Sequence, residues 1–251
     1  MKTVLITGHE GNVGAKTLTA GIVSSLRVQN VPALALDLCP SNLLRLHFGM
    51  NPADPSGIAR CILAGQPMEE ANYRNHEGID FMPFGTLNQD EQRQLSAWSQ
   101  QNPGWLRHWT SRLNLPAHAW LVCHAPFSTH ALWRDLADHG WQLEVFALDA
   151  LTLLHMEQAA HDANHLRSAH TSWVLNGFDA TRRLDRDTEL VVRATYQQLI
   201  SPVTLHRDEH HREALAQRST IQAYAPSSQG AHDMTALSLW LGSLAPMEGG
   251  L

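Results

Sequence analysis

The chain has 251 residues, a net charge of −6 and 17% charged residues, so it is long enough to bury a substantial core in one large or two small domains. The acidic balance argues against a general nucleic-acid-binding protein, which would carry a basic stripe. Three cysteines without paired spacing predict neither a disulfide framework nor a zinc finger. No apolar run is long enough to cross a bilayer, and residues 1–7 read as a strand rather than a secretory signal, so we expect a cytoplasmic globular protein.

Short apolar runs alternate with longer segments of helical period along the whole chain. The apolar runs predict strands at 3–7, 31–38, 79–84, 119–126, 141–149, 171–178 and within 201–209. Helices are expected between them, among them one over about 55–74, one over 89–114 that breaks at 102–104 (Asn-Pro-Gly), and a closing helix over 231–244. This alternation predicts an α/β fold with a doubly wound, mostly parallel sheet and helices on both faces.

No internal repeat, low-complexity block or long linker interrupts this pattern, so we expect a single domain over 1–251 with a short flexible tail at about 245–251. In a doubly wound sheet, ligands bind beyond the carboxyl ends of the strands. The candidate functional side chains at those ends are His9, Cys39, Cys123, His124 and Asn176.

Residues 8–17 (GHEGNVGAKT) have the outline of a phosphate-binding loop between a strand and a helix. Such a loop offers backbone N–H groups and a helix N-terminus to phosphate, and its pattern G-x-x-x-x-G-K-[ST] adds a lysine and a magnesium-binding hydroxyl. Gly8 and Gly14 have the required spacing, but Ala15 takes the lysine position and Lys16 the hydroxyl position. The glycine frame is kept, while the groups that act on the phosphates are replaced.

The loop resembles the deviant phosphate-binding loop of the MinD and ParA ATPases, K-G-G-x-G-K-[ST]-[ST], onto which residues 10–17 fall. The positions that the resemblance covers include Glu10, Gly11, Asn12, Gly14, Ala15, Lys16 and Thr17. In that family, the first lysine reaches across a sandwich dimer to the partner's nucleotide. Glu10 stands at this position and reverses its charge.

Three later segments are similar to the cellulose-synthesis branch of these ATPases, the BcsQ (YhjQ) family. They are 36–50 (LDLCPSNLLRLHFGM), 81–92 (FMPFGTLNQDEQ) and 205–224 (LHRDEHHREALAQRSTIQAY). The resemblance covers nearly the whole chain and implies the P-loop NTPase fold of the MinD/ParA (SIMIBI) class. It also implies a role in bacterial cellulose synthesis and biofilm formation.

The same resemblance locates the remaining nucleotide positions. The first switch, D-x-D-P, keeps Asp37 but has Cys39 in place of the second aspartate. The magnesium-binding aspartate of the Walker B strand is replaced by His124, and Asn176 matches the asparagine that reads adenine. Phosphoryl transfer depends on positioning and on charge stabilisation by lysines and metal, so these combined replacements predict that hydrolysis is lost.

Several of these residues have simpler alternatives. Imidazole and thiolate ligate zinc or copper, and the strand ends should bring His9, Cys39, Cys123 and His124 near one another. Because Cys123 and His124 point to opposite faces of a strand, we nevertheless expect no metal site. Asn176 could be a turn residue before Gly177. Three tryptophans in the helical region 89–114 are expected to pack one helical face; they are Trp98, Trp105 and Trp109.

The charged segment 206–213 is either a solvated helix start with Asp208 as its N-cap or a partner surface. Together with the loop, it supplies the candidate interface residues Glu10, Arg207, Asp208 and Glu209. The chain ends without the basic helix by which MinD binds membranes, so no direct membrane insertion is expected.

The resemblance therefore implies a pseudo-ATPase that acts in cellulose synthesis and secretion by dimerisation and docking. Expected partners are the cytoplasmic components of the cellulose synthase, which would recruit the protein to the inner membrane, and a second MinD-like subunit in a homodimer or heterodimer. We expect no cofactor, although residual ATP or ADP binding stays open. One alternative is an ATP-binding, slowly hydrolysing switch, and another is a metal- or redox-responsive adaptor using Cys39 and His124.

Overall fold

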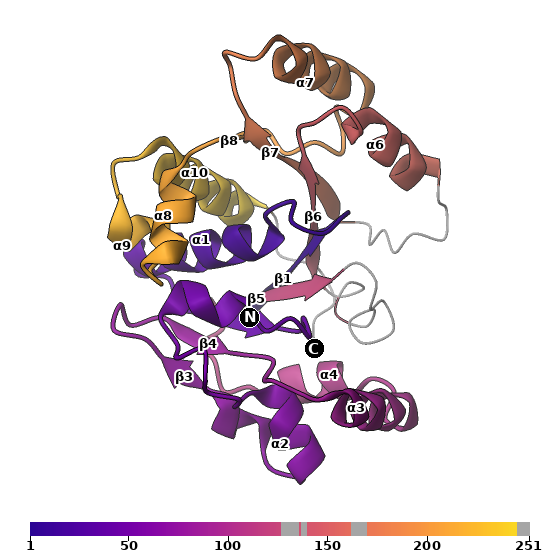
Figure 1. Cartoon of the computed structure of the whole chain (residues 1–251), viewed down its shortest axis with the longest axis vertical. Coiled ribbons are helices and arrows are strands. Elements are labelled where there is room, and N and C mark those ends of the chain that lie inside the picture. Colours follow the sequence, from indigo (N-terminus) through magenta and orange to yellow (C-terminus); the bar gives the residue numbers. More distant parts are fainter. Residues whose placement is uncertain (127–135, 137–139, 162–169, 245–251) are drawn as a thin grey trace.

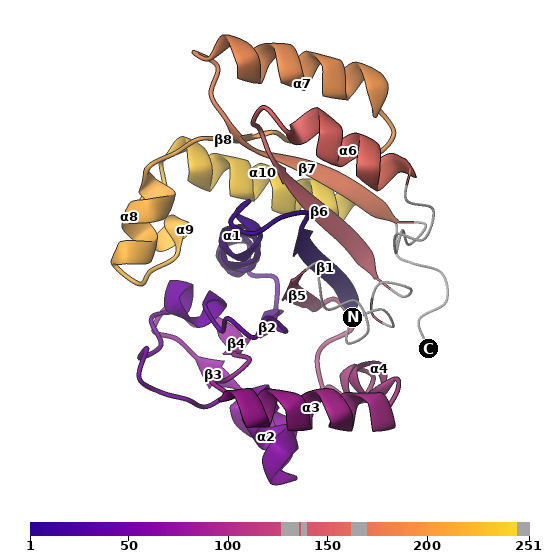
Figure 2. The same cartoon turned by 45° about the vertical axis from the view of Figure 1, so that its right-hand side comes forward.

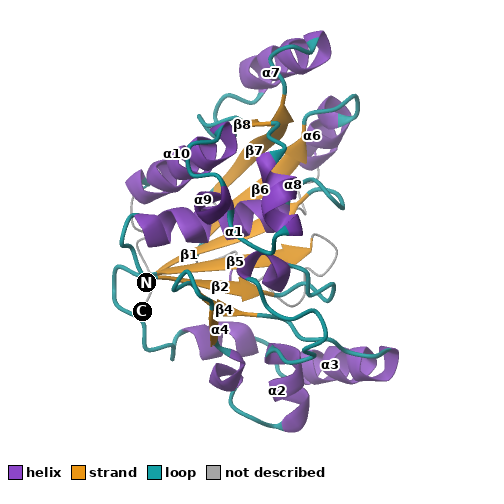
Figure 3. Ribbon diagram, turned by 60° about the vertical axis from the view of Figure 1, so that its left-hand side comes forward, coloured by secondary structure: helices purple, strands orange, loops and turns teal. Residues whose placement is uncertain are grey.

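An eight-stranded sheet runs through the chain in the computed structural model, which describes residues 1–126, 136, 140–161 and 170–244. The strand order is β3-β4-β2-β5-β1-β6-β7-β8, and every pairing is parallel except that of β3 with β4. The strands are β1 (Lys2–Gly8), β2 (Ala33–Asp37), β3 (Tyr73–Arg74), β4 (Asp80–Met82), β5 (Trp120–Pro126), β6 (Trp141–Ala147), β7 (Thr171–Phe178) and β8 (Leu205–His206). The predicted fold class, a doubly wound and mostly parallel α/β sheet, is confirmed (Figure 3).

Helices cover both faces of the sheet (Figures 1 and 2). On one face, α1 (Ala15–Val28) and α10 (Gln229–Ser243) pack against each other and against a shared apolar core, with α8 (His210–Ala216), α9 (Ile221–Tyr224) and the 3-10 helix η1 (Leu44–Phe48) beside them. The other face is covered by two groups. One comprises α2 (Ile58–Ala64), α3 (Gln89–Gln101) and α4 (Trp105–Thr110), and the other α6 (Thr152–His161) and α7 (Arg183–Thr195).

Alternation along the central strands divides their side chains between the two faces. Val4 and Ile6 of β1 join the core under α1, whereas Leu5 joins the core on the opposite face. In β5, Val122 lies on the α1 face and Cys123 on the other. This alternation places the side chain of His124 on the α1 face, at the carboxyl end of its strand.

The helix expected over 55–74 is wrong in extent. It is a seven-residue helix, α2, followed by the 3-10 helix η2 (Met68–Ala71) and by β3, which the sequence pattern did not predict. Gly65 ends α2 with a left-handed φ of 66°, and Pro67 follows two residues later. Gly57 precedes α2, where an added Cβ would lie 2.2 Å from the backbone nitrogen of Gly85, so this turn is built around a close backbone approach.

The break predicted within 89–114 is confirmed, because α3 ends at Gln101 and α4 begins at Trp105. The three tryptophans consequently lie on two helices rather than on one face of a single helix. Trp98 and Trp105 meet edge to face at 5.3 Å, and the indole N–H of Trp109 donates to Glu69 at 3.1 Å. The tail predicted at 245–251 lies outside the described residues, and the single-domain boundary stays a prediction.

Candidate functional site

The loop between β1 and α1 is held in a conformation that glycine and asparagine permit. Asn12 and Gly14 have positive φ angles of 66° and 97°, and Gly14 is the N-cap of α1. The side-chain amide of Asn176, at the end of β7, donates to the carbonyl of Val13 at 2.8 Å. A Cβ on Gly14 would lie 2.3 Å from that amide nitrogen, so the loop and Asn176 fit only with glycine at this position.

This loop forms one wall of a cavity of about 630 Å³ at the carboxyl edge of the sheet. The lining includes every residue from Gly8 to Thr17, so the predicted loop positions face one space. The other described residues that line it are Cys39, Ser41, Leu43, Leu46, His47, His124, Ala125, Pro126 and Leu215. Sequence-predicted residues from three strand ends are thereby brought together, whereas Asp37 and Asn176 lie behind them as supports.

Asp37 and His124 form a buried pair at the centre of this edge. They are direct neighbours in the β2–β5 register, and His124 Nδ1 lies 2.9 Å from Asp37 Oδ1. Asp37 also accepts the backbone N–H groups of Cys39 at 3.0 Å and Leu44 at 3.3 Å. Both carboxylate oxygens are therefore engaged, and the carboxylate serves the protein's own donors.

His47 and Lys16 face the same cavity from η1 and from the first turn of α1. The side chain of His47 is buried, and it forms no hydrogen bond with any residue that the structure describes. Burial first, and then the charge of the neighbouring His211, Lys16 and His124, lower the pKa of His47 to about 4. No sequence pattern indicated a role for His47, because a 3-10 helix of five residues has no amphipathic repeat.

Comparison with known proteins identifies the family to which the chain belongs. The family model described as "Cellulose biosynthesis protein BcsQ" matches residues 1–241. The chain belongs to the BcsQ family. The cellulose biosynthesis protein BcsQ of Escherichia coli K12 is 29% identical to it, over 96% of this chain and 94% of the relative, and that of Salmonella typhi is 28% identical, over 94% and 92%.

Solved structures place the BcsQ-family chain within the MinD/ParA P-loop ATPase fold. The cell division ATPase MinD of Pyrococcus furiosus matches with a TM-score of 0.73 at 20% identity, over 97% of this chain and 99% of that one. MinD of Pyrococcus horikoshii, complexed with Mg-ADP, matches with a TM-score of 0.71 at 19% identity, over 94% of each chain. A ParA family ATPase of Chlorobium tepidum matches with a TM-score of 0.71 at 15% identity, over 95% and 98%.

The residues of this BcsQ-family site do not fit a magnesium ion. Magnesium demands octahedral oxygen coordination, and in such sites it is held by hydroxyl and carboxylate groups. By the family resemblance, Lys16 and His124 stand where those groups are expected, and their side chains offer nitrogen instead of oxygen. The nearby carboxylate of Asp37 already accepts three N–H donors.

A metal site of histidine and cysteine finds no support in the part of the chain that the structure describes, where no three His, Cys, Asp or Glu side chains are arranged to hold an ion. Cys39 lines the cavity with its sulfur 3.1 Å from the hydroxyl of Ser41. Cys123, in contrast, is fully buried in the core on the opposite face, and burial raises the pKa of its thiol. Cys123 and His124 therefore lie on opposite faces of β5, as the alternation of the strand predicted.

The loop also makes acid–histidine pairs that sequence reasoning missed. Glu10 Oε1 lies 2.7 Å from His155 Nε2 on α6, and His9 Nδ1 lies 3.0 Å from Glu144 Oε1 on β6. The ring of His9 stacks on Phe146 with centroids 5.0 Å apart. A glutamate inside the apolar run of β6 was the available signal for a buried partner.

The candidate interface residues near α8 include one with a structural role. Asp208 accepts the backbone N–H of Gly230 at 2.7 Å and that of His210 at 3.0 Å, and so ties the start of α8 to α10. Helix α8 begins at His210 with Glu209 at the N-cap, one residue later than predicted. Arg207 and Glu209 are exposed, and Glu209 pairs with Arg212 at 3.0 Å.

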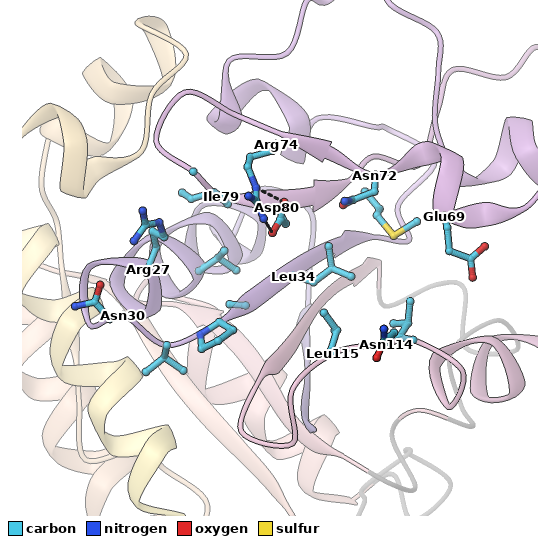
Figure 4. Close-up of a pocket in the computed structure, with 17 residues that line it drawn as sticks. Arg27, Asn30, Leu34, Glu69, Asn72, Arg74, Ile79, Asp80, Asn114 and Leu115 are labelled. Carbon is cyan, nitrogen blue, oxygen red and sulfur yellow. Dashed lines mark hydrogen bonds and ion pairs between the residues drawn. The ribbon is translucent and has the colours of Figure 1, made fainter.

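A second cavity, of about 490 Å³, lies at the opposite edge of the sheet, where β2 and β4 begin (Figure 4). Its apolar floor includes Leu34 and Ile79, and a bidentate pair of Arg74 with Asp80, at 2.8 and 2.7 Å, crosses its rim. No sequence-predicted functional residue lines it. None of the described helices is long and apolar enough to span a membrane.

Proposed function

We propose that this BcsQ-family protein is a pseudo-ATPase that serves cellulose synthesis by dimerisation and docking, without hydrolysing ATP. The observation that carries the proposal is the buried pair of His124 with Asp37. A nucleotide hydrolase of this fold needs a carboxylate free to hold the metal, and here the position carries an imidazole bonded to the neighbouring carboxylate. Family membership supports the link to cellulose biosynthesis.

The proposed partners follow from the family rather than from a described contact. They are the cytoplasmic components of the cellulose synthase and a second MinD-like subunit, in a homodimer or a heterodimer. The proposed location is the cytoplasm, with recruitment to the inner membrane through the synthase complex.

Release of inorganic phosphate from ATP in the presence of magnesium tests the loss of hydrolysis. We expect the purified protein to release no more phosphate than the same protein after denaturation. The matched variant restores three positions of the family pattern with Ala15→Lys, Lys16→Thr and His124→Asp together, and a gain of turnover in it would assign the loss to these three groups. Magnesium-dependent turnover by the unmodified protein would establish the alternative, a slowly hydrolysing ATP switch.

A further inference from the structure

Lys16 is one of only two lysines in the sequence, and the two have different surroundings. The ammonium group of Lys2 donates to the carbonyl of Gly242 at 3.1 Å and lies 5.2 Å from the centroid of the Trp120 ring. Lys16 lines the cavity and forms no ion pair or hydrogen bond with any residue in the described part of the chain. Its charge is therefore left for an occupant of the cavity.

His47 is a second group without a partner. The residue is 5% exposed and lines the cavity, yet its ring makes no hydrogen bond within residues that the structure describes. Polar groups in protein interiors are nearly always hydrogen-bonded, either to protein or to ordered water. An occupant that accepts a hydrogen bond would satisfy this imidazole.

The ring of His124 is held in place by Asp37 at the wall of the cavity. Asp37 holds the proton on Nδ1, and its carboxylate is itself fixed by the backbone N–H groups of Cys39 and Leu44. Nε2, the other nitrogen of this cavity-lining ring, makes no hydrogen bond with any residue described by the structure. Nε2 is therefore the ring nitrogen of His124 that is left for an occupant of the cavity.

The backbone adds donors to these three side chains. Helix α1 is 14 residues long and begins at the cavity without a side-chain cap and without an acidic residue in its first turn. The first N–H groups of such a helix have no partner within the helix, and they attract anions together with the helix dipole. The acidic residue of the loop, Glu10, is paired with His155.

We infer that this cavity binds a polyphosphate group without a divalent cation, and that the positive charge of Lys16 and the hydrogen-bonding imidazole of His47, with His124 beside them, take the place that magnesium has in metal-dependent relatives of the fold. The inference rests on the proposed function, because a site that hydrolysed ATP would need the metal that these residues do not fit. The ligand class is a nucleoside triphosphate or diphosphate, or a linear polyphosphate, since all share the phosphate chain.

Calorimetric titration with ATP, GTP and tripolyphosphate, each in EDTA and in magnesium, tests the inference. We expect the dissociation constant for ATP to change by less than about threefold between the two conditions, because no coordination bond is lost. Tripolyphosphate that binds as well as ATP would identify the phosphate chain as the recognised group, and preference for ATP over GTP would add a contribution from the base.

Lysine labelling provides a readout on the unmodified protein. An amine-reactive reagent followed by peptide mass spectrometry reports on both lysines, and ATP in EDTA should protect Lys16 while Lys2 reacts equally with and without it. The variants Lys16→Ala and His47→Gln should each weaken metal-free binding about tenfold, as loss of one charge-assisted hydrogen bond does. His76→Gln is the matched control, since His76 is exposed and does not line the cavity.

The outcomes separate the inference from the proposed function. Binding that requires magnesium without phosphate release, or no binding at all, would overturn the inference and leave the proposed function standing. Magnesium-dependent binding with phosphate release would overturn both. Equal labelling of Lys16 with and without ATP in EDTA would also overturn the inference, even if the variants failed to fold.

Discussion

Single side chains decide what this site can do. An aspartate at position 124 would leave two carboxylates facing each other unless a metal ion separated them, whereas the imidazole of His124 pairs with Asp37 within the protein at 2.9 Å. A lysine at position 16 likewise replaces an oxygen ligand by a positive charge. The first change removes an oxygen ligand for a metal ion, and the second also places a positive charge of the chain itself at the loop.

His47 makes stability depend on pH in a predictable direction. Its pKa is about 4 in the folded protein and 6.5 in the unfolded chain, so between these values the unfolded chain binds a proton that the folded protein does not. The free energy of unfolding therefore falls as pH drops from 6.5 to 4, by about 3 kcal/mol from this residue, and the loss saturates below that range. Above pH 6.5, both states are neutral and the residue contributes nothing to the slope.

Urea unfolding at a series of pH values checks this prediction. His47→Gln cannot titrate, so its stability should fall less steeply between pH 6.5 and 4 than that of the wild type. His76→Gln, at an exposed position, should keep the wild-type slope. Parallel curves for wild type and His47→Gln would contradict a buried neutral imidazole at this position.

At the scale of elements, the residues at each end decide where a helix begins and stops. Helix α2 shows this because glycine flanks it on both sides for different reasons. Gly57 is extended, with φ 162°, and its constraint is steric, since an added Cβ would lie 2.2 Å from the backbone of Gly85. Gly65 has open space around it, and its constraint is the left-handed φ of 66°.

Alanine substitutions at these two positions should separate the two constraints. Gly57→Ala must displace backbone, so we expect a loss of about 3 kcal/mol in the free energy of unfolding. Gly65→Ala costs only the backbone conformation, about 1 kcal/mol. Denaturant unfolding of both variants measures the difference, and equal losses would show that the approach of Gly57 to Gly85 is not a constraint on the fold.

Across the whole molecule, the apolar runs were sufficient to predict seven of the strands and the doubly wound class, because buried parallel strands leave continuous signals. The site was predictable where its residues end such strands, as Cys39 and His124 do. His47 and His155 were not predictable as site residues. The residues around His47 and the partner of His155, Glu10, lie on elements distant in the sequence, and only the folded chain brings them together. Asn176 stabilises the loop by donating to the backbone carbonyl of Val13, and no sequence pattern predicts such a contact.

The loop also bears on dimerisation of the protein, and substitution of Glu10 tests its part in it. Its side chain is 46% exposed and pairs with His155 of its own chain, so part of the carboxylate stays accessible to a second subunit. If this carboxylate meets a partner's basic loop in a sandwich dimer, Glu10→Lys should weaken dimerisation about tenfold at low salt. The effect should shrink as added salt screens the charges.

Sedimentation velocity without nucleotide, at low and high ionic strength, measures this dimerisation. His155→Gln is the control, because it removes the pairing within the chain and keeps the charge of Glu10, so its dimerisation should resemble that of the wild type. Loss of the dimer in both variants would assign the effect to loop structure instead of charge across the interface. Identical distributions for wild type and Glu10→Lys would remove Glu10 from the interface altogether.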